Sequence, residues 1–247
     1  MKAPSGRDAD IVVVDNEQAL AEHVADRFID DADAAISGRG LFIVALAGGT
    51  TPKAAYELLA QDPRRGEIDW EKVRFFFGDE RCVPPTDDES NYKMAKIAMF
   101  DPLEIDLSHV FRMHGEDDPE RAAAAYADVL RAQLAPEPQF DLIMLGMGPD
   151  GHTASLFPGN SPGADARLVA APFVPKFGTH RITLTPRVIN NARAVVIATA
   201  GPTKTEVLEH VLRGPYDPNA YPVQIVSPTR GTLTWYVDHI AAAKIGL

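Results

Sequence analysis

Residues 41–52 read LFIVALAGGTTP, and this stretch decides the fold class. Its first half is a continuous apolar run, which is typical of a β-strand buried on both faces of a sheet. Its second half suits a turn into a helix, because Thr51 is a favourable N-cap and Pro52 a favourable first helical residue. A buried strand that leads directly into a helix is the repeating unit of parallel α/β sheets.

The alternation of strand and helix continues on both sides of this stretch. The expected strands share short apolar runs and cover residues 11–14, 41–46, 73–77, 110–113, 140–145, 181–185, 193–199 and 223–226. The expected helices share capping residues or a helical apolar period; they run from Asp15, with Gln18 closing a capping box, to about Gly38 or Gly40, and over 52–60, 90–100, 118–134, 204–213 and 235–245. This pattern predicts an α/β fold with an open, mostly parallel sheet and helices on both faces, as in Rossmann-like proteins.

We expect a single domain over residues 1–247, with residues 1–10 flexible and the least regular pattern at 159–178. The formal net charge is −11, and no run of Lys and Arg is present, which argues against a nucleic-acid partner. The single cysteine, Cys82, cannot form an internal disulfide, which fits a reducing cytoplasm. The N-terminal residues do not resemble a secretion signal, and every apolar run is too short for a membrane helix.

Four loops follow expected strands, at residues 48–51, 78–81, 148–152 and 201–204. In open α/β sheets, ligands bind beyond the carboxyl ends of the strands, so we expect these loops to meet around one site. Because the chain is acidic overall, a site for an anionic ligand must be locally basic.

The first loop and the last loop have features of a phosphate site. Gly48 and Gly49 let the backbone approach a ligand, and the helix that begins at Pro52, after Thr51 as its N-cap, directs N–H groups toward an anion. Lys204 stands at the start of a helix, where a cation is disfavoured unless it neutralises an anion. A tight, well-capped turn and a solvated lysine are the structural alternatives.

The third loop contains a literal G-x-G-x-x-G at residues 146–151, but it does not predict a dinucleotide site. Asp150 would repel the pyrophosphate, and no acidic residue ends a strand about 20 residues further on, as ribose binding requires. His152 is the more informative residue, because a histidine at the mouth of a sheet can take a proton from water near neutral pH. The adjacent Asp150 could orient it.

The second loop carries the charged triplet Asp79, Glu80 and Arg81, which would be costly to bury without partners. Arg81 could hold a carboxylate of the enzyme or an oxygen of the substrate with its planar fork of donors. Cys82 is more typical of a small core thiol than of a nucleophile. The sequence lacks G-x-S-x-G, H-E-x-x-H, a Cys/His cluster and a P-loop, so we expect neither a metal nor a cofactor.

Five ordered segments resemble the 6-phosphogluconolactonase family: LAGGTTP at 46–52, FGDERCVP at 77–84 with SNY at 90–92, LGMGPDGHTASLFPG at 145–159, RITLT at 181–185 and GPTK at 201–204. The resemblance spans about residues 10–235. It implies cytoplasmic hydrolysis of 6-phosphoglucono-1,5-lactone to 6-phosphogluconate, a step of the oxidative pentose phosphate pathway.

The resemblance also implies roles for individual residues. His152 would be the general base that activates water, Asp150 or Asp79 would orient it, and Arg81 or loop N–H groups would stabilise the oxyanion. The remaining expected site residues bind the substrate and its phosphate; they are Gly48, Gly49, Thr50, Thr51, Arg181 and Lys204.

The family is similar in fold to glucosamine-6-phosphate deaminases, which share the Gly-Gly-Thr, Asp-Glu and Asp-Gly-His segments. Those enzymes carry Glu where this chain has Phe157 and Tyr where it has Arg81, and both departures favour a lactonase. A deaminase-type isomerase and a non-catalytic phosphosugar sensor remain alternatives, although such a sensor usually carries a DNA-binding domain for which the chain has no room before Ile11. The expected partner is a small phosphosugar lactone, with neither nucleic acid nor membrane, and monomer and dimer both stay open.

Overall fold

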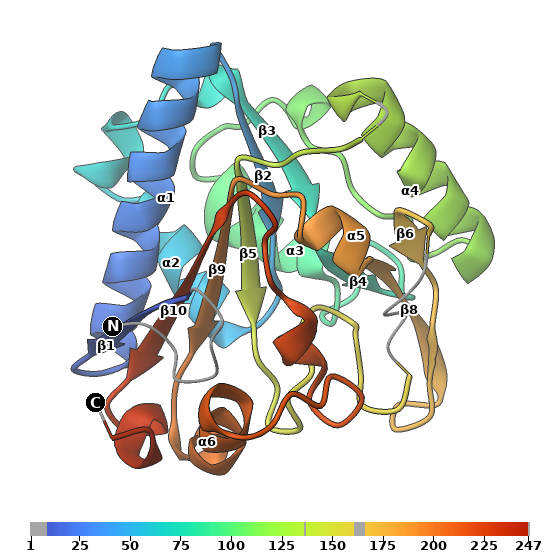
Figure 1. The fold of residues 1–247 in the computed structure, drawn as a ribbon. Helices are drawn as coiled ribbons and strands as arrows, with labels where there is room; N and C mark the ends of the chain where they lie inside the picture. Colours follow the sequence, from blue (N-terminus) through green and yellow to red (C-terminus); the bar gives the residue numbers. More distant parts are fainter. Residues whose placement is uncertain (1–8, 136, 161–165, 247) are drawn as a thin grey trace.

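The structure is a computed structural model that describes residues 9–135, 137–160 and 166–246. Within these residues, six parallel strands form the central sheet in the order β1-β10-β9-β5-β2-β3. Their bounds are β1 Asp10–Val14, β2 Phe42–Leu46, β3 Val73–Phe77, β5 Leu142–Gly146, β9 Ala194–Thr199 and β10 Thr232–Asp238. The arrowheads of β5, β9 and β10 point to the same edge in Figure 1. The predicted α/β fold with a mostly parallel sheet is confirmed.

Helices cover both faces of this sheet (Figure 1). One face carries α1 Glu17–Arg39, α2 Thr50–Leu59 and α3 Asn91–Ala95, which continues as a π-helical turn over Lys96–Phe100; the other carries α4 Pro119–Leu134, α5 Pro186–Ile189 and α6 Thr205–Arg213. Strand β9 shows why the strands are apolar throughout. Val195 and Ile197 pack toward α4 and α6, while Val196 packs toward α1 and α2.

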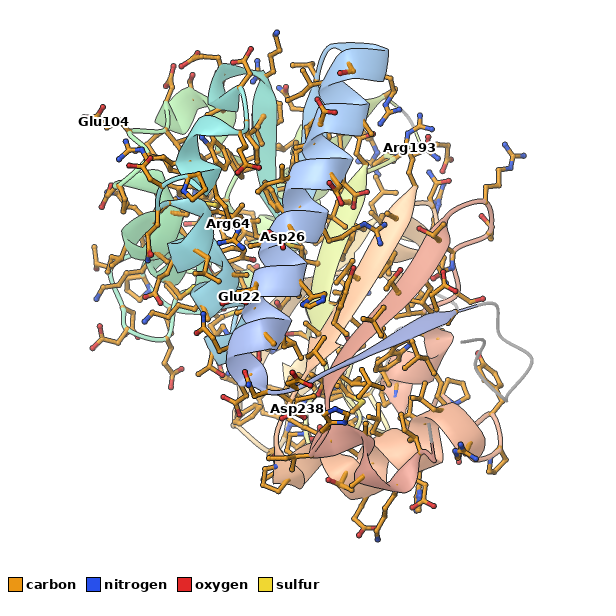
Figure 2. All side chains as sticks on the ribbon, turned by 90° about the vertical axis from the view of Figure 1, so that its left-hand side faces the viewer. Glu22, Asp26, Arg64, Glu104, Arg193 and Asp238 are labelled. Carbon is orange, nitrogen blue, oxygen red and sulfur yellow. The ribbon has the colours of Figure 1, made fainter. Side chains whose placement is uncertain are left out.

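Figure 2 views the sheet across α1, with Asp238 and Arg193 marking its two opposite edges. Arg193 directly precedes β9, and Asp238 ends β10 at the carboxyl edge. The outer surface of α1 is charged. Its Asp26 forms an ion pair with Arg64, with 2.9 Å between Asp26 Oδ1 and Arg64 Nε. No described helix combines the length and the apolar character that a membrane crossing needs.

A second, smaller sheet stands beyond the carboxyl edge of the first. Its strand β8 Thr179–Leu184 pairs antiparallel with β4 Asp79–Arg81, β6 Val169–Ala170 and β7 Phe173–Val174. The expected polar loop at 78–81 is therefore mostly a short strand. The pairing places residues of β4 and β8 opposite each other, and this brings two parts of the predicted site together.

Two helix starts differ slightly from the prediction. Asn16, not Asp15, caps α1 by accepting the N–H of Ala19 at 2.9 Å, and Gln18 bonds to Glu22 instead of closing a capping box. Helix α2 begins at Thr50 because Gly49 serves as its N-cap with a φ of 105°, so Thr51 lies inside the first turn.

Two expected elements near the C-terminus are wrong. The expected strand at 223–226 is a 3-10 helix, Pro222–Ile225, in which the side chain of Gln224 donates to the backbone oxygen of Val211 at the end of α6. The expected helix at 235–245 is not formed: its first residues, to Asp238, belong to strand β10, and only a short 3-10 helix follows at Ala241–Lys244. β10 lies between β1 and β9, and its β-branched and aromatic residues suit this strand, so the helical prediction misread the segment.

Two smaller expectations also need correction. Residues 110–113 make a single bridge to β3, between Val110 and Phe75, and no strand. Of the segment expected to be flexible, residues 1–8 lie outside the described residues, and Asp10 already begins β1. The irregular stretch at 159–178 contains β6 and β7, and its residues 161–165 lie outside the described residues.

Candidate active site

A cavity of about 380 Å³ opens at the carboxyl edge of the sheet, where the segments after β2, β3, β5 and β9 meet. The predicted site residues that line it are Gly48, Gly49, Thr50, Thr51, Asp79, Arg81, His152, Arg181 and Lys204. Asp150 is the remaining predicted residue, and it contacts His152 directly. The fold thus brings together all the residues that the sequence singled out.

The imidazole of His152 pairs with Asp150. The distance between His152 Nδ1 and Asp150 Oδ1 is 2.5 Å, and both side chains are about one-quarter exposed. An ionised carboxylate only accepts hydrogen bonds, so we assign the proton to Nδ1, which leaves the lone pair of Nε2 available. The bond to His152 keeps the pKa of Asp150 well below its usual range. Asp150, and not Asp79, is therefore the partner of the histidine.

Glycines in the loop Gly146–His152 allow the ring of His152 to occupy its position. The Gly148 N–H donates to the backbone oxygen of His152 at 2.8 Å, which closes the loop. A Cβ at residue 148 would lie 2.0 Å from His152 Nδ1, so only glycine leaves room for the ring. Gly151 has a φ of 77°, which favours glycine. These constraints explain the second and third glycines of the G-x-G-x-x-G pattern without a nucleotide.

Phe157 packs against one face of the His152 ring. The two rings are stacked, with centroids 4.4 Å apart and an interplanar angle of 27°. Phe157 is buried, so it holds the imidazole plane and keeps water from one face of the ring. Phe157 is one of the two positions, with Arg81, at which the sequence departs from the deaminase pattern.

Asp79 lines the cavity but is held by other partners. One carboxylate oxygen accepts from Ser155 Oγ at 2.7 Å, and the other accepts from Asn91 Nδ2 at 3.2 Å. Ser155 belongs to the loop that carries His152, so this bond ties strand β4 to that loop. Sequence reasoning missed both partners, although the SNY and TAS triplets that contain them were part of the quoted segments.

Glu80, the middle residue of the charged triplet, has a structural role. Its carboxylate accepts from the N–H groups of Asn91 and Tyr92 at 2.8 and 2.9 Å, at the start of α3. Burial raises the pKa of Glu80. A carboxylate at a helix N-terminus satisfies N–H groups that have no partner within the helix. This pairing fixes α3, and with it Asn91.

Arg81 and Arg181 form a basic wall of the cavity. They are register partners in the β4–β8 pair. Arg81 donates to the backbone oxygen of Glu89, while the guanidinium of Arg181 lies over the ring of Phe177, 5.0 Å from its centroid. Burial, and then the neighbouring charge of Arg81, lower the pKa of Arg181. Two adjacent cations of this kind favour an anion between them.

Another part of the cavity lining is suited to a phosphate group. Thr50 and Thr51 form the first turn of α2, which has no acidic residue and no side-chain cap. Its N–H groups and the positive end of the helix dipole are therefore available to an anion in the cavity. Lys204 is the last residue of the 3-10 turn Pro202–Lys204 and the N-cap of α6, and burial lowers its pKa. Asp238 accepts the N–H of Gly201 at 3.1 Å and so holds this loop (Figure 2).

Several lining residues were missed by sequence reasoning, including Glu17, Thr199 and Phe177. Thr199 Oγ1 is buried and has no hydrogen-bond partner within the described residues. Cys82 does not line the cavity, and burial raises the pKa of its thiol. No group of three or more His, Cys, Asp or Glu side chains suited to a metal occurs in the described part of the chain.

The arrangement combines three chemical capacities in one cavity. The free Nε2 of His152 can accept a proton from water, and the guanidiniums of Arg81 and Arg181 can stabilise a developing oxyanion. Lys204 and the start of α2 can hold a dianion. Such a site fits hydrolysis of an ester in a phosphorylated molecule.

Comparisons with known proteins agree with this geometry. A family model described as "Glucosamine-6-phosphate isomerases/6-phosphogluconolactonase" matches residues 15–235. A 6-phosphogluconolactonase of Synechocystis is 38% identical over 240 residues, which cover 94% of this chain and 97% of that protein. One of Treponema pallidum is 38% identical over 208 residues, which cover 83% and 84%. The solved structure of a 6-phosphogluconolactonase from Trypanosoma cruzi superposes with a TM-score of 0.88 at 27% identity, covering 100% of this chain and 99% of that one.

Proposed function

This chain belongs to the glucosamine-6-phosphate isomerase/6-phosphogluconolactonase family, and we propose that it is a 6-phosphogluconolactonase. It hydrolyses 6-phospho-D-glucono-1,5-lactone to 6-phospho-D-gluconate in the oxidative pentose phosphate pathway. Relatives with that name match nearly the whole chain. The observation that carries the proposal is that the His152–Asp150 pair and the phosphate-binding residues Thr50 and Lys204 belong to one cavity.

The reaction begins with proton transfer from water. Nε2 of His152 takes a proton while the water oxygen attacks the lactone carbonyl carbon. Asp150 keeps the ring in the required orientation and stabilises the imidazolium that forms. The carbonyl oxygen becomes an oxyanion, and the guanidiniums of Arg81 and Arg181 stabilise it.

The second step opens the ring. The tetrahedral intermediate collapses, the bond between the carbonyl carbon and the ring oxygen breaks, and His152 returns its proton to that oxygen. The product is a hydroxy acid, which releases a proton to solvent and leaves a carboxylate. Asp79, held by Ser155 and Asn91, accepts a hydrogen bond from a sugar hydroxyl or from the attacking water. The reaction requires no redox step, so the proposal includes no cofactor.

The phosphate group anchors the substrate at the start of α2 and at Lys204. Gly48 and Gly49 allow the chain to approach it, and the N–H groups at Thr50 and Thr51 donate to its oxygens. Lys204 neutralises part of its charge, and Arg181 reaches the same anion from β8. His152 and the phosphate-binding residues line the same cavity of about 380 Å³. A substrate held by its phosphate therefore keeps its lactone carbonyl near His152.

The direct test uses freshly prepared lactone and a coupled assay that follows 6-phosphogluconate through its oxidative decarboxylation by a dehydrogenase. We expect turnover well above spontaneous hydrolysis, and a turnover lowered by about 10²- to 10⁴-fold for His152→Ala. The deaminase alternative predicts ammonia release from glucosamine 6-phosphate. The sensor alternative predicts binding of phosphosugars without turnover. Phe157 at the side of the imidazole supports the lactonase.

We propose that residues 1–247 are one lactonase domain, which acts on a small phosphosugar lactone in the cytoplasm. The single thiol of Cys82 is half-buried and has no second cysteine with which to form a disulfide, so it suits a reducing compartment.

A further inference from the structure

The turn between β7 and β8 brings two side chains to the candidate active site. Two backbone hydrogen bonds close this turn. The Phe177 N–H donates to the backbone oxygen of Val174 at 3.0 Å, and the Gly178 N–H donates to that of Pro175 at 3.2 Å. Gly178 has a φ of 63°, which a glycine adopts readily. Lys176 and Phe177 lie at the tip of this turn. Neither has a role in the proposed reaction.

Lys176 contacts the carboxylate that orients the histidine. Asp150 uses one oxygen for His152, at 2.5 Å, and its other oxygen lies 3.1 Å from Nζ of Lys176. A carboxylate with one partner can rotate about its terminal bond. With both oxygens bound to different elements, its plane is fixed, and so is the direction of the hydrogen bond to the imidazole.

Phe177 ties the same turn to the imidazole by a second route. Its ring lies edge-on to Phe157, with centroids 5.8 Å apart, and Phe157 stacks on His152. On its other side, the guanidinium of Arg181 lies over the Phe177 ring. The turn therefore contacts both the carboxylate partner and the aromatic partner of the histidine.

We propose that Lys176 is a positioning residue, which acts through Asp150 to hold His152 in the orientation needed to activate water. This inference rests on the lactonase function proposed above. Lys176 does not line the cavity, whereas Lys204 does, so a direct contact with substrate is the weaker explanation. The charged groups that face Asp150 are His152, Lys176 and, at longer range, Lys204.

A role in stability does not explain the Lys176 contact. The lysine side chain is 56% exposed, and ion pairs with an exposed partner contribute little to folding. Replacement of Lys176 should therefore leave the fold intact, which makes the position suitable for a kinetic test. Lys72 offers a matched control, because it is 49% exposed, pairs with Asp69 at 2.9 Å and lies at the amino-end edge of the sheet.

The kinetic test is a double-mutant cycle with lactone as substrate. We expect Lys176→Met to lower kcat by roughly 3- to 10-fold with little change in KM, a typical coupling between neighbouring side chains. Lys176→Arg should restore most of the rate, and Lys72→Met should match the wild type. In an Asp150→Asn background, Lys176→Met should change kcat by less than about 2-fold, because its route to the histidine is already lost.

A measurement without substrate separates this inference from the proposed function. Nitrogen-15 spectra of the His152 ring report which nitrogen carries the proton. We expect the Nδ1–H form in the wild type and in Lys72→Met, and a mixture of forms in Lys176→Met. Unchanged ring signals would overturn the inference, as would an equal loss of kcat in both backgrounds or a rise in KM alone. A wild-type protein without lactonase activity would refute the function, while the ring spectra would still test Lys176.

Discussion

Arg81 and Arg181 lie opposite each other in the β4–β8 pair, and both line the same cavity. Two neighbouring guanidiniums repel, and Arg181 is also buried, so the folded protein holds this pair at a cost in stability. An anionic oxygen between them removes the repulsion. The wall is therefore arranged for a charge that the substrate supplies, in its phosphate or in the oxyanion of the transition state.

The arginine pair leads to a prediction in which activity and stability change in opposite directions. Arg181→Met should lower kcat/KM by about 10²- to 10³-fold, because a donor to the developing charge is lost. It should leave the free energy of unfolding unchanged or raise it, since a buried, repelled charge is removed. Steady-state kinetics and urea unfolding measure the two effects. Arg187→Met, an exposed arginine paired with Glu137, is the control. Full activity in Arg181→Met would contradict the role of this wall.

Loss of the histidine should affect turnover more than binding. His152→Ala removes the general base, so kcat should fall by about 10²- to 10⁴-fold with a modest change in KM. Binding of 6-phosphogluconate, measured by calorimetry, should stay within a few-fold of the wild type, because the phosphate residues are untouched. A variant that keeps the wild-type kcat would remove His152 from the mechanism.

Gly148 provides a test of ring placement that leaves the histidine in the chain. In Gly148→Ala, the added Cβ would lie 2.0 Å from Nδ1 of His152, so the ring must move away from Asp150. We expect kcat to fall by at least about 10-fold, because misplacement of a catalytic group by about 1 Å is costly. Gly38→Ala is the matched control. No atom lies within 4 Å of that added Cβ, and an alanine inside α1 should add about 0.5–1 kcal/mol of stability. Equal kinetics for the two variants would disprove the crowding argument.

The affinity for phosphate should depend on pH at the alkaline end. Burial lowers the pKa of Lys204 in the free protein, so the lysine begins to lose its proton at a lower pH than an exposed lysine does. Only the charged form attracts a phosphate dianion. Affinity for 6-phosphogluconate should therefore fall as pH rises toward 10, and binding at such pH should take up a proton.

Calorimetry at pH 7.5 and 9.5, in two buffers of different ionisation enthalpy, measures both the affinity and the proton uptake. Lys204→Arg should bind with little change over this range, because the guanidinium stays charged. An affinity that is equally flat in the wild type would show that Lys204 does not carry the phosphate charge.

Local sequence was sufficient for most of the fold because buried parallel strands have a distinct composition. A run such as FIVAL at 42–46 buries all its apolar side chains only in a strand that has a neighbouring strand on each side and a helix layer on each face. In the structure, this run is β2, between β5 and β3. Where the local pattern was ambiguous, it misled. The segment from Trp235 was predicted to be a helix, yet its β-branched and aromatic residues suit a strand, and they form β10 because the gap between β1 and β9 supplies hydrogen bonds on both sides.

The sequence by itself determined which loops carry the site, because polar residues after buried strands must gather at the carboxyl edge of a parallel sheet. Only the tertiary structure decided which side chains meet there: Asp150 with His152, Asp79 with Ser155, and Arg81 beside Arg181. Those contacts depend on strand register and on turns such as the one that presents Lys176. Register and turn geometry result from packing between distant segments, so no local pattern of residues specifies them.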